Sequence, residues 1–361
     1  MSDEPVGPDE LVQVVFEFVR VVFLVLDGMP APSVATDVTP VLGSWCAASG
    51  TTPHTVAAVL PATTYPNHAT FVTGVAPAEH GIVGNHVLCE DGRFRPARKI
   101  GLAVPTIFDH VTAAGLTSTL VVGDQELIGV MGGAGAGSHW PPDGKVPAGA
   151  ATDEHGYLHD DETLPVLLDA IASDVDLVVG QLNAPDTAGH VHGPASDEAR
   201  AVYLATDARL GAVRDAVEAR DDDTVVMIVS DHAVETVEVA TPIDLTEALE
   251  GTGLTWFPEG SAALVYGEHP DLEGLLGRVT ELAGSATMAP GIHVVWGAPG
   301  RWLCFDGIDA EPGMHGSPRT AVQLATVVGT HPAVRDLDAR IPHAGFDATS
   351  WAGEMARLLL P

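Results

Sequence analysis

The sequence predicts an α/β fold whose mostly parallel central sheet is flanked by helices on both faces. Short runs of β-branched residues alternate with amphipathic stretches along the chain, as they do when helices connect the strands of a parallel sheet. With 361 residues, 46% of them hydrophobic, the chain can bury a large core. The alternation becomes less regular from Thr236 to Pro312. We therefore expect one domain over residues 1–361, with a small α+β elaboration at about 236–312.

Five apolar runs are the expected strands of this sheet: Arg20–Leu26, Val56–Leu60, Ser118–Val122, Asp176–Leu182 and Thr224–Val229. Two stretches, Asp161–Ala172 and Ser196–Ala219, predict helices most clearly. Ser196 suits the N-cap of the second helix, and the Asp-Glu pair after it favours the first helical turn. Within the elaboration we expect strands at Ala262–Tyr266 and Trp302–Phe305 and a helix near Leu272–Leu282, and a last helix near Ser350–Leu360 closes the chain.

The charge balance excludes several classes of partner. The formal net charge is −33, and Lys99 and Lys145 are the only lysines. Nucleic-acid backbones and anionic lipid surfaces both require a basic face, so neither polymeric nucleic acid nor a membrane is an expected partner. A salt-adapted cytosol, where the carboxylates stay hydrated and screened, and a GC-rich genome both account for this acidity, and the sequence leaves both open. It also leaves the oligomeric state open.

The same sequence favours a cytoplasmic protein. The longest apolar run near the start, Val21–Leu26, is bounded by Arg20 and Asp27, and is far too short to span a membrane. The first residues are acidic where a secretory signal is basic. Three widely spaced cysteines form no Cys-x-x-Cys pair, so we expect buried thiols rather than disulfides.

The segment 61–85 is the most informative part of the chain. Thr63 and Thr64 follow an apolar run and precede Pro66, which can open a helix. A hydroxyl in that position faces the free N–H groups of a helix N-terminus, where a phosphate is stabilised. The two threonines are equivalent candidates on this ground.

Aspartates and histidines that can bind metal recur after the apolar runs. Asp27 follows the first strand, and Asp231-His232 follows Thr224–Val229. Asp186 and His190 are four residues apart, a spacing that places them on one helical face or in one tight loop. The remaining candidate, His315, lies in a loop rich in Gly and Pro, and the other histidines, including His68, His80 and His192, are assigned to packing or the surface. Because ligands of open α/β sheets bind at the carboxyl ends of strands, these residues predict one metal-binding site.

Three aspartates and three histidines suit two divalent ions. Zinc accepts mixed nitrogen and oxygen ligands, and manganese or iron remains possible. Two metals about 3.5–4 Å apart stabilise the attacking and leaving oxygens of an in-line displacement. Metal coordination also lowers the pKa of a hydroxyl, so a threonine nucleophile needs no separate base.

On these motifs the chain resembles the alkaline phosphatase superfamily, and within it the nucleotide pyrophosphatase/phosphodiesterase (type I phosphodiesterase) family. The resemblance implies an alkaline-phosphatase-like catalytic domain, and it selects Thr64, directly before Tyr-Pro-Asn-His, as the nucleophile. It implies that one zinc binds Asp27, Asp231, His232 and Thr64, that the second binds Asp186, His190 and His315, and that Asn85 donates to a phosphoryl oxygen. The chain departs from the family by carrying Ala233, where Gly is usual, after the Asp-His pair.

The resemblance implies a two-metal hydrolase of phosphodiester or pyrophosphate bonds in small, nucleotide-type substrates, acting through a phosphothreonine. The alternative is a phosphomonoesterase or phosphonate hydrolase of the same superfamily. Phosphonoacetate hydrolase, a relative, has a substrate-binding lysine pair where this chain has Gly123 and Gln125. A phosphoglycerate mutase would need a large insertion between Thr64 and Asp186, and a non-catalytic binding protein would lack some of the ligands. Tyr65 and Trp140 either stack on the substrate or belong to the core.

Overall fold

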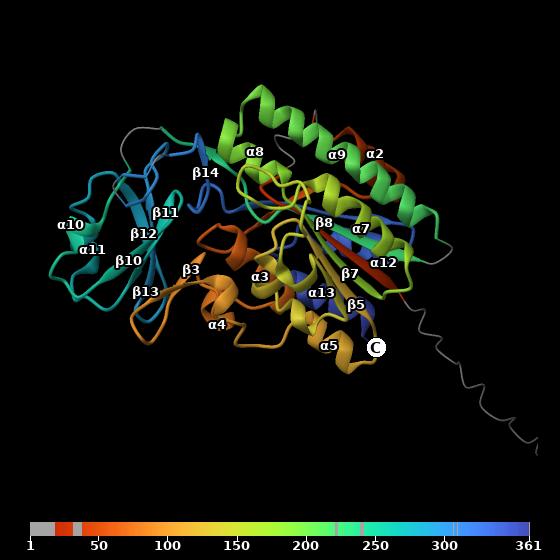
Figure 1. The fold of residues 1–361 in the computed structure, drawn as a ribbon, viewed down its shortest axis with the longest axis horizontal. Helices are drawn as coiled ribbons and strands as arrows, with labels where there is room; N and C mark the ends of the chain where they lie inside the picture. Colours follow the sequence, from red (N-terminus) through yellow and green to blue (C-terminus); the bar gives the residue numbers. More distant parts are fainter. Residues whose placement is uncertain are drawn as a thin grey trace, which may run out of the picture.

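The computed structural model describes residues 19–31, 38–220, 223–238, 242–305, 307–308 and 310–360. Its centre is a seven-stranded sheet with the order β2-β15-β8-β1-β7-β5-β6 (Figure 1). The strands are β1 (Arg20–Leu26), β2 (His54–Ala57), β5 (Ser118–Val122), β6 (Ser138–Trp140), β7 (Leu177–Leu182), β8 (Thr224–Val229) and β15 (Val322–Gly329). From β8 to β6 all neighbours are parallel, and β15 runs antiparallel to β8 and β2.

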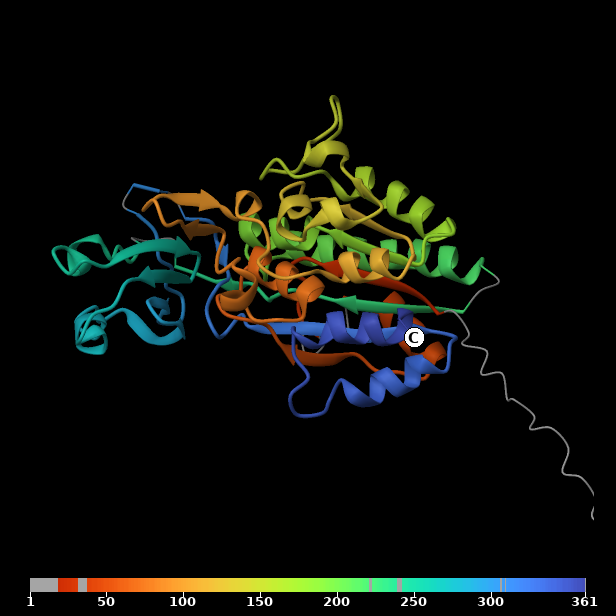
Figure 2. The same ribbon diagram turned by 90° about the horizontal axis from the view of Figure 1, so that it is seen from below.

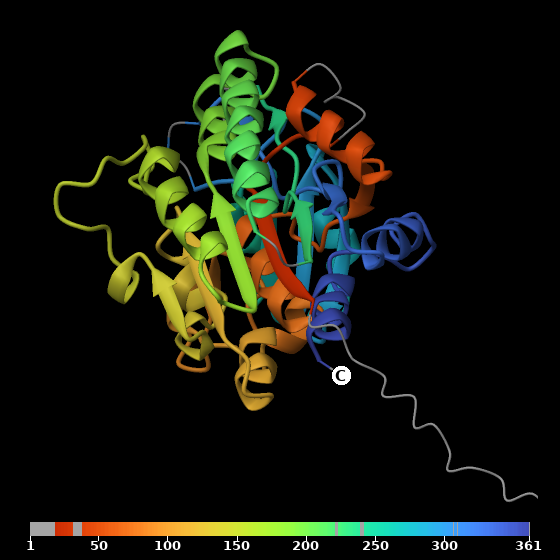
Figure 3. The same ribbon diagram turned by 90° about the vertical axis from the view of Figure 1, so that its right-hand side faces the viewer.

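Helices cover both faces of this sheet (Figures 2 and 3), and the predicted fold class is confirmed. The reason lies in β1, where all seven residues are buried. Because side chains alternate along a strand, Phe23 faces one core and Leu24 the other. The Phe23 core is covered by α3 (Thr64–Thr73), α5 (Ile107–Ala113), α12 (Ala333–Arg340) and α13 (Ser350–Leu359), and the Leu24 core by α2 (Pro40–Ser49), α7 (Asp160–Ala172), α8 (Ala184–His192) and α9 (Asp197–Glu218).

A second sheet lies beside the first. It has the antiparallel order β10-β11-β13-β12, with β10 (Thr255–Glu259), β11 (Ala262–Tyr266), β12 (Leu282–Ala289) and β13 (Ile292–Gly297). The short helices α10 (Thr246–Leu249) and α11 (Leu272–Leu276) accompany it, and it falls within the predicted elaboration. The hairpin of β3 (His86–Leu88) and β4 (Phe94–Pro96) packs on this sheet through Phe94 and Phe257, whose ring centroids are 4.8 Å apart. The single-domain division stays a prediction.

One short strand pair and two short helices complete the elements near the site. The strands β9 (Glu235–Thr236) and β14 (Gly313–Met314) pair with each other, and α4 (Pro77–His80) and α6 (Leu127–Val130) lie in the connections. Turns of 3₁₀ helix occur at Ala97–Lys99, Gly133–Gly135 and Pro142–Gly144.

Three predicted elements are corrected. The strand predicted at Val56–Leu60 is β2 and ends at Ala57, because the N–H of Val59 donates to the side chain of Asn67 (3.0 Å) instead of to a strand. The stretch Trp302–Phe305 is no strand: its apolar side chains pack inward, but only Leu303 forms an isolated bridge. The predicted helix Leu272–Leu282 ends at Leu276, beside Gly277, and Leu282 already begins β12.

Within the described residues, no helix combines the length and the hydropathy of a membrane span. The first residues of the chain, on which the prediction of a cytoplasmic location depends, lie outside the described residues. All three cysteines are free thiols; Cys46 and Cys304 are buried and Cys89 is half-buried.

Candidate metal centre

The carboxyl ends of three neighbouring strands bring the predicted aspartates together. Asp27 directly follows β1, Asp231 lies two residues beyond β8, and Asp186 lies in the first turn of α8, just after β7. The strands β8, β1 and β7 are adjacent and parallel, so their carboxyl ends meet at one edge of the sheet. All three aspartates are buried.

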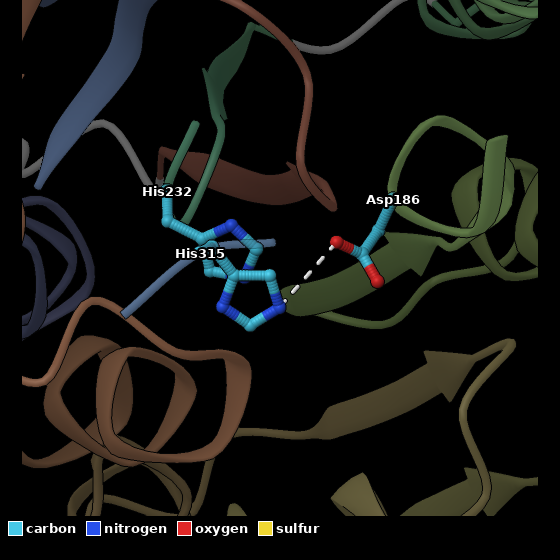
Figure 4. Close-up of side chains that lie close together, drawn as sticks. All are labelled: Asp186, His232 and His315. Atoms are coloured by element: carbon cyan, nitrogen blue, oxygen red, sulfur yellow. Dashed lines mark ion pairs between the residues drawn. The ribbon is translucent and has the colours of Figure 1, made fainter. Parts of the chain in front are cut away.

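Histidines complete two clusters around these carboxylates. In one, Asp27, Asp231 and His232 offer ligand atoms that all lie within 4.8 Å of one another. In the other, Asp186, His232 and His315 do the same, and Figure 4 shows these three side chains facing one another. The Nε2 atom of His232 is 3.2 Å from Oδ2 of Asp231 and 3.8 Å from Oδ1 of Asp27. His315 Nε2 is 3.8 Å from Oδ1 of Asp186. His232 thus lies between the two sets.

His190 adjoins the second cluster. Its Nε2 atom is 3.6 Å from Oδ1 of Asp186, and its ring centroid is 4.9 Å from that of His315. Both Asp186 and His190 lie on α8, so the helical alternative for their spacing is the observed one. On the other side of the ring, Nδ1 lies 3.1 Å from Oε2 of Glu311. Burial lowers the pKa of His190, but Asp186 and Glu311 outweigh it and raise that pKa to about 9.

Tight turns hold the aspartates in place. Gly28 has φ of +63°, and a Cβ atom there would lie 2.7 Å from the Cα of Asp186. Only glycine therefore allows the turn after β1 to pass so close to α8. The N–H groups of Gly28 and His232 both donate to Oδ1 of Asp231 at 3.0 Å. The turn thereby orients Oδ2 of Asp231 toward His232.

The cluster fits divalent cations. Asp27 Oδ1, Asp186 Oδ1 and Asp231 Oδ2 are buried and accept no hydrogen bond from the described residues. Burial, with the charges of Asp231 and Asp186, raises the pKa of Asp27 well above its usual value. Three close, buried carboxylates repel one another, and binding a cation or a proton relieves that repulsion. Burial also lowers the pKa of His232 and His315 well below 6.5, so both rings are neutral, as metal ligands must be.

Thr64 is the first residue of α3, and Thr63 is its extended N-cap. The Oγ1 atom of Thr64 is 3.2 Å from Nε2 of His232. Asn67 fixes the turn that presents it: its side chain donates to the carbonyl of Thr63 (2.9 Å) and accepts from the N–H of Val59. The structure thus places the hydroxyl of Thr64 at a helix N-terminus and against the metal-ligand cluster.

A cavity of about 240 Å³ opens beside Thr64. Its lining is mostly polar and consists of Thr64, Tyr65, Asn85, Asp124, His155, Tyr157, Asn183, Asp186, His190, Glu259, Gly260, Met314 and His315. Asn85 lines it, and its Oδ1 atom accepts no hydrogen bond from the described residues. Of the two aromatic candidates, Tyr65 lines the cavity, whereas Trp140 packs against the Leu24 core.

Sequence reasoning missed several groups around the cavity. The N–H of Asn85 donates to both carboxylate oxygens of Glu259, at 2.8 and 3.0 Å. Burial raises the pKa of Glu259 to about 8, although these hydrogen bonds oppose the shift. Burial likewise raises the pKa of Asp124 to about 8. His155 pairs with Glu311 at 2.8 Å. None of these residues lies in a motif, and glutamates are common on surfaces, so no local pattern singles them out.

The histidines assigned to packing or the surface have different surroundings. His80 is buried, 3.0 Å from the hydroxyl of Thr70, and His192 is exposed. His68 is also buried, but its Nδ1 atom lies 2.9 Å from the carbonyl of Thr64 and 3.5 Å from Oδ2 of Asp231. The ring of His68 therefore contacts both the backbone of Thr64 and the carboxylate of Asp231.

Sequence comparisons identify known proteins to which this chain is similar. A sequence model of the type I phosphodiesterase / nucleotide pyrophosphatase family matches residues 21–281. Ectonucleotide pyrophosphatase/phosphodiesterase family member 7 of Rattus norvegicus is 27% identical over 248 residues, which are 64% of this chain and 54% of that protein. The Homo sapiens protein is also 27% identical, over 51% of its length. The chain thus spans about half the length of these curated relatives.

Solved structures share the fold. Murine ectonucleotide pyrophosphatase/phosphodiesterase 5, in an inactive form with AMP, aligns with a TM-score of 0.68 and 16% identity, over 94% of this chain and 95% of that one. Phosphonoacetate hydrolase of Sinorhizobium meliloti, in complex with phosphonoformate, aligns with a TM-score of 0.69 and 16% identity, over 95% and 96%.

Proposed function

The chain belongs to the type I phosphodiesterase / nucleotide pyrophosphatase family, and we propose that it hydrolyses phosphodiester or pyrophosphate bonds of small, nucleotide-type substrates. One observation carries the proposal: the hydroxyl of Thr64 lies at a helix N-terminus, 3.2 Å from Nε2 of His232. The anion-stabilising end of α3 and the cation-binding carboxylates thus face the same atom.

Two divalent ions, zinc by preference, would be held by these residues. Asp27, Asp231, His232 and Thr64 would hold one, and Asp186, His190 and His315 the other, with His232 beside both. When bound, such ions lower the pKa of the threonine hydroxyl and neutralise the charge that develops on the phosphoryl group. The orphaned carboxylate oxygens of the cluster support this assignment.

The protein's own groups then define the reaction. The Oγ1 atom of Thr64 attacks phosphorus, a bond forms between them, and the bond to the leaving oxygen breaks. Asn85 and the free N–H groups at the start of α3 bind phosphoryl oxygens. Water then hydrolyses the phosphothreonine and restores the hydroxyl of Thr64. The rigid turn held by Asn67 keeps the nucleophile in place through both steps.

A monoesterase or phosphonate hydrolase is the second candidate, because phosphonoacetate hydrolase shares the fold. The cavity lining argues against a carboxylate-bearing phosphonate: among the described residues that form it, there is no lysine or arginine. A second small anionic group beside the scissile phosphorus would face the carboxyl groups of Asp124, Asp186 and Glu259 and no lysine or arginine.

The test compares Thr64→Ala with Thr64→Ser in zinc-loaded protein. Initial rates are measured with bis-p-nitrophenyl phosphate and with p-nitrophenyl phosphate, and bound metal is measured in every variant. We expect the diester to be the better substrate of the wild type. Thr64→Ala should lose turnover by about a thousandfold or more with metal still bound, and Thr64→Ser should keep part of it. Near-normal turnover by Thr64→Ala would refute the nucleophile, and a preference for the monoester would favour the second candidate.

A further inference from the structure

The carboxylate of Glu311 lies between two histidine rings beside the second cluster. Its Oε2 atom is 3.1 Å from Nδ1 of His190, and its Oε1 atom is 2.8 Å from Nε2 of His155. The side chain of His190 is nearly buried, and that of Glu311 is partly exposed. The proposed function makes His190 a metal ligand but gives neither Glu311 nor His155 a part.

The segment that carries Glu311 packs tightly against helix α8. A Cβ atom on Gly313 would overlap with the carbonyl oxygen of Gly189 in α8, so only glycine allows the two backbones to approach so closely. The carbonyl of Pro312 accepts a hydrogen bond from the N–H of Val237 at 3.0 Å. The backbone directly after Glu311 is therefore held in place against α8.

The loop that carries His155 is attached to the same helix. The Oδ1 atom of Asp153 accepts a hydrogen bond from the N–H of His155 at 3.0 Å. The Oδ2 atom of Asp153 accepts from the hydroxyl of Thr187 (2.7 Å) and from the side-chain amide of Asn183 (2.9 Å), the N-cap of α8. The loop is thus fixed on the helix that also carries His190.

The contact with Glu311 selects the ring nitrogen through which His190 can bind a metal. A histidine that binds a metal is neutral, and its ring keeps one proton. Because a carboxylate only accepts hydrogen bonds, that proton stays on Nδ1, the atom that faces Glu311. The Nε2 atom, which lies 3.6 Å from Oδ1 of Asp186, then keeps its lone pair for the metal.

We propose that Glu311 is a positioning residue for the metal ligand His190, and that His155 holds the carboxylate of Glu311 in place. The proposal rests on the metal assignment of the proposed function. A carboxylate behind a metal-bound histidine fixes the tautomer and the orientation of the ring, and its loss typically weakens metal binding roughly 10–100-fold. Glu311 precedes His315 by four residues, so one segment supplies a ligand and positions another.

The test measures the affinity of the metal-stripped protein for two zinc ions, by competition with a chelating dye. Glu311→Ala should weaken the binding of one ion about tenfold, the low end of the usual range, because the carbonyl of Gly313 remains beside the ring. The other ion should bind unchanged, and Glu311→Gln, which keeps an acceptor, should lose less. The control Glu281→Ala removes the carboxylate of another partly exposed ion pair, with Arg301, and should change neither affinity. Wild-type affinities in Glu311→Ala would overturn the proposal, and so would equal weakening of both ions, which indicates a general structural effect.

A double-mutant cycle tests the part of His155. If His155 acts on the metal only through Glu311, His155→Phe should weaken the same zinc ion in the wild-type background and have no further effect in Glu311→Ala. An equal loss in both backgrounds would contradict this order of contacts.

These titrations use no substrate, so they are independent of hydrolysis. A protein that binds two zinc ions without hydrolysing a diester would refute the proposed hydrolase, and the variants would still decide on Glu311. A wild type that binds no zinc would overturn both proposals.

Discussion

Replacement of Gly260, which is not a predicted metal ligand, by alanine should displace the loop of His315 and weaken metal binding. Gly260 lies in the turn between β10 and β11, with φ of +72°. A Cβ atom there would lie 2.3 Å from the backbone oxygen of His315, far inside van der Waals contact. The next residue, Ser261, donates its N–H to that same oxygen at 2.7 Å. Because both groups belong to backbones, neither can rotate away, and the His315 loop must move.

The loss of folding stability expected for Gly260→Ala is the sum of two free-energy costs. An alanine in the left-handed region costs about 1–2 kcal/mol. Loss of the buried hydrogen bond from Ser261 costs about 1–3 kcal/mol more. Gly253 provides the matched control, since it has φ of +81° and a Cβ atom added there would meet no other atom within 4 Å. Gly253→Ala should therefore show the first cost alone, and Gly260→Ala a total of about 2–5 kcal/mol.

The assay combines urea unfolding, bound zinc and the rate of diester hydrolysis for the two variants. We expect Gly253→Ala to keep wild-type metal content and activity despite its lower stability. Gly260→Ala should bind less zinc and lose most of its activity, because His315 is displaced from Asp186. If Gly260→Ala matched Gly253→Ala in all three measurements, the proposed link between this turn and the metal centre would be wrong.

Three further predictions concern charge. Zinc should raise the melting temperature of the metal-stripped protein, because it relieves repulsion among buried Asp27, Asp186 and Asp231, and Asp231→Asn should reduce that rise; an unchanged rise would contradict the assignment. Burial raises the pKa of Asp124 from 3.8 to about 8, so the folded protein retains a proton that the unfolded chain has lost between these values, and stability should fall as pH rises through this window. In urea titrations at pH 5 and pH 8, the free energy of unfolding should differ less between the two pH values for Asp124→Asn than for the wild type. An equal difference would refute the raised pKa of Asp124. Glu259→Leu should lower diester turnover about tenfold or more by leaving the part-buried N–H of Asn85 without an acceptor, while Glu259→Gln keeps one acceptor and should lose less; equal losses would show that the acceptor is unimportant.

Much of the main sheet follows from local sequence, because its strands are contiguous and buried on both faces. The predicted bounds Arg20–Leu26, Ser118–Val122 and Thr224–Val229 coincide with β1, β5 and β8. Errors arise where apolar residues serve packing without pairing, as at Trp302–Phe305. The antiparallel β15 is absent from the predicted strands, because its pairing with β2 and β8 depends on residues far away in the chain.

The candidate site likewise contains residues whose positions follow from local sequence and residues whose positions depend on distant parts of the chain. Asp27 and Asp231 follow strong strands, so their convergence can be predicted from topology. The environment of Asn85 cannot, because its partner Glu259 lies 174 residues away on the second sheet. The family resemblance assigns His232 to one metal, whereas its position between both clusters follows from the stacking of its ring on His315, with centroids 3.8 Å apart. The ligand assignments remain predictions.

The central claim is that Thr64 carries the phosphoryl group during turnover. The most direct measurement is mass spectrometry of the peptide containing Thr64 after acid quenching of the zinc-loaded protein during hydrolysis of bis-p-nitrophenyl phosphate. The account predicts the phosphoryl part of the substrate attached to Thr64, and no adduct in Thr64→Ala. A wild-type protein that turns over while its adduct lies on another residue would contradict it.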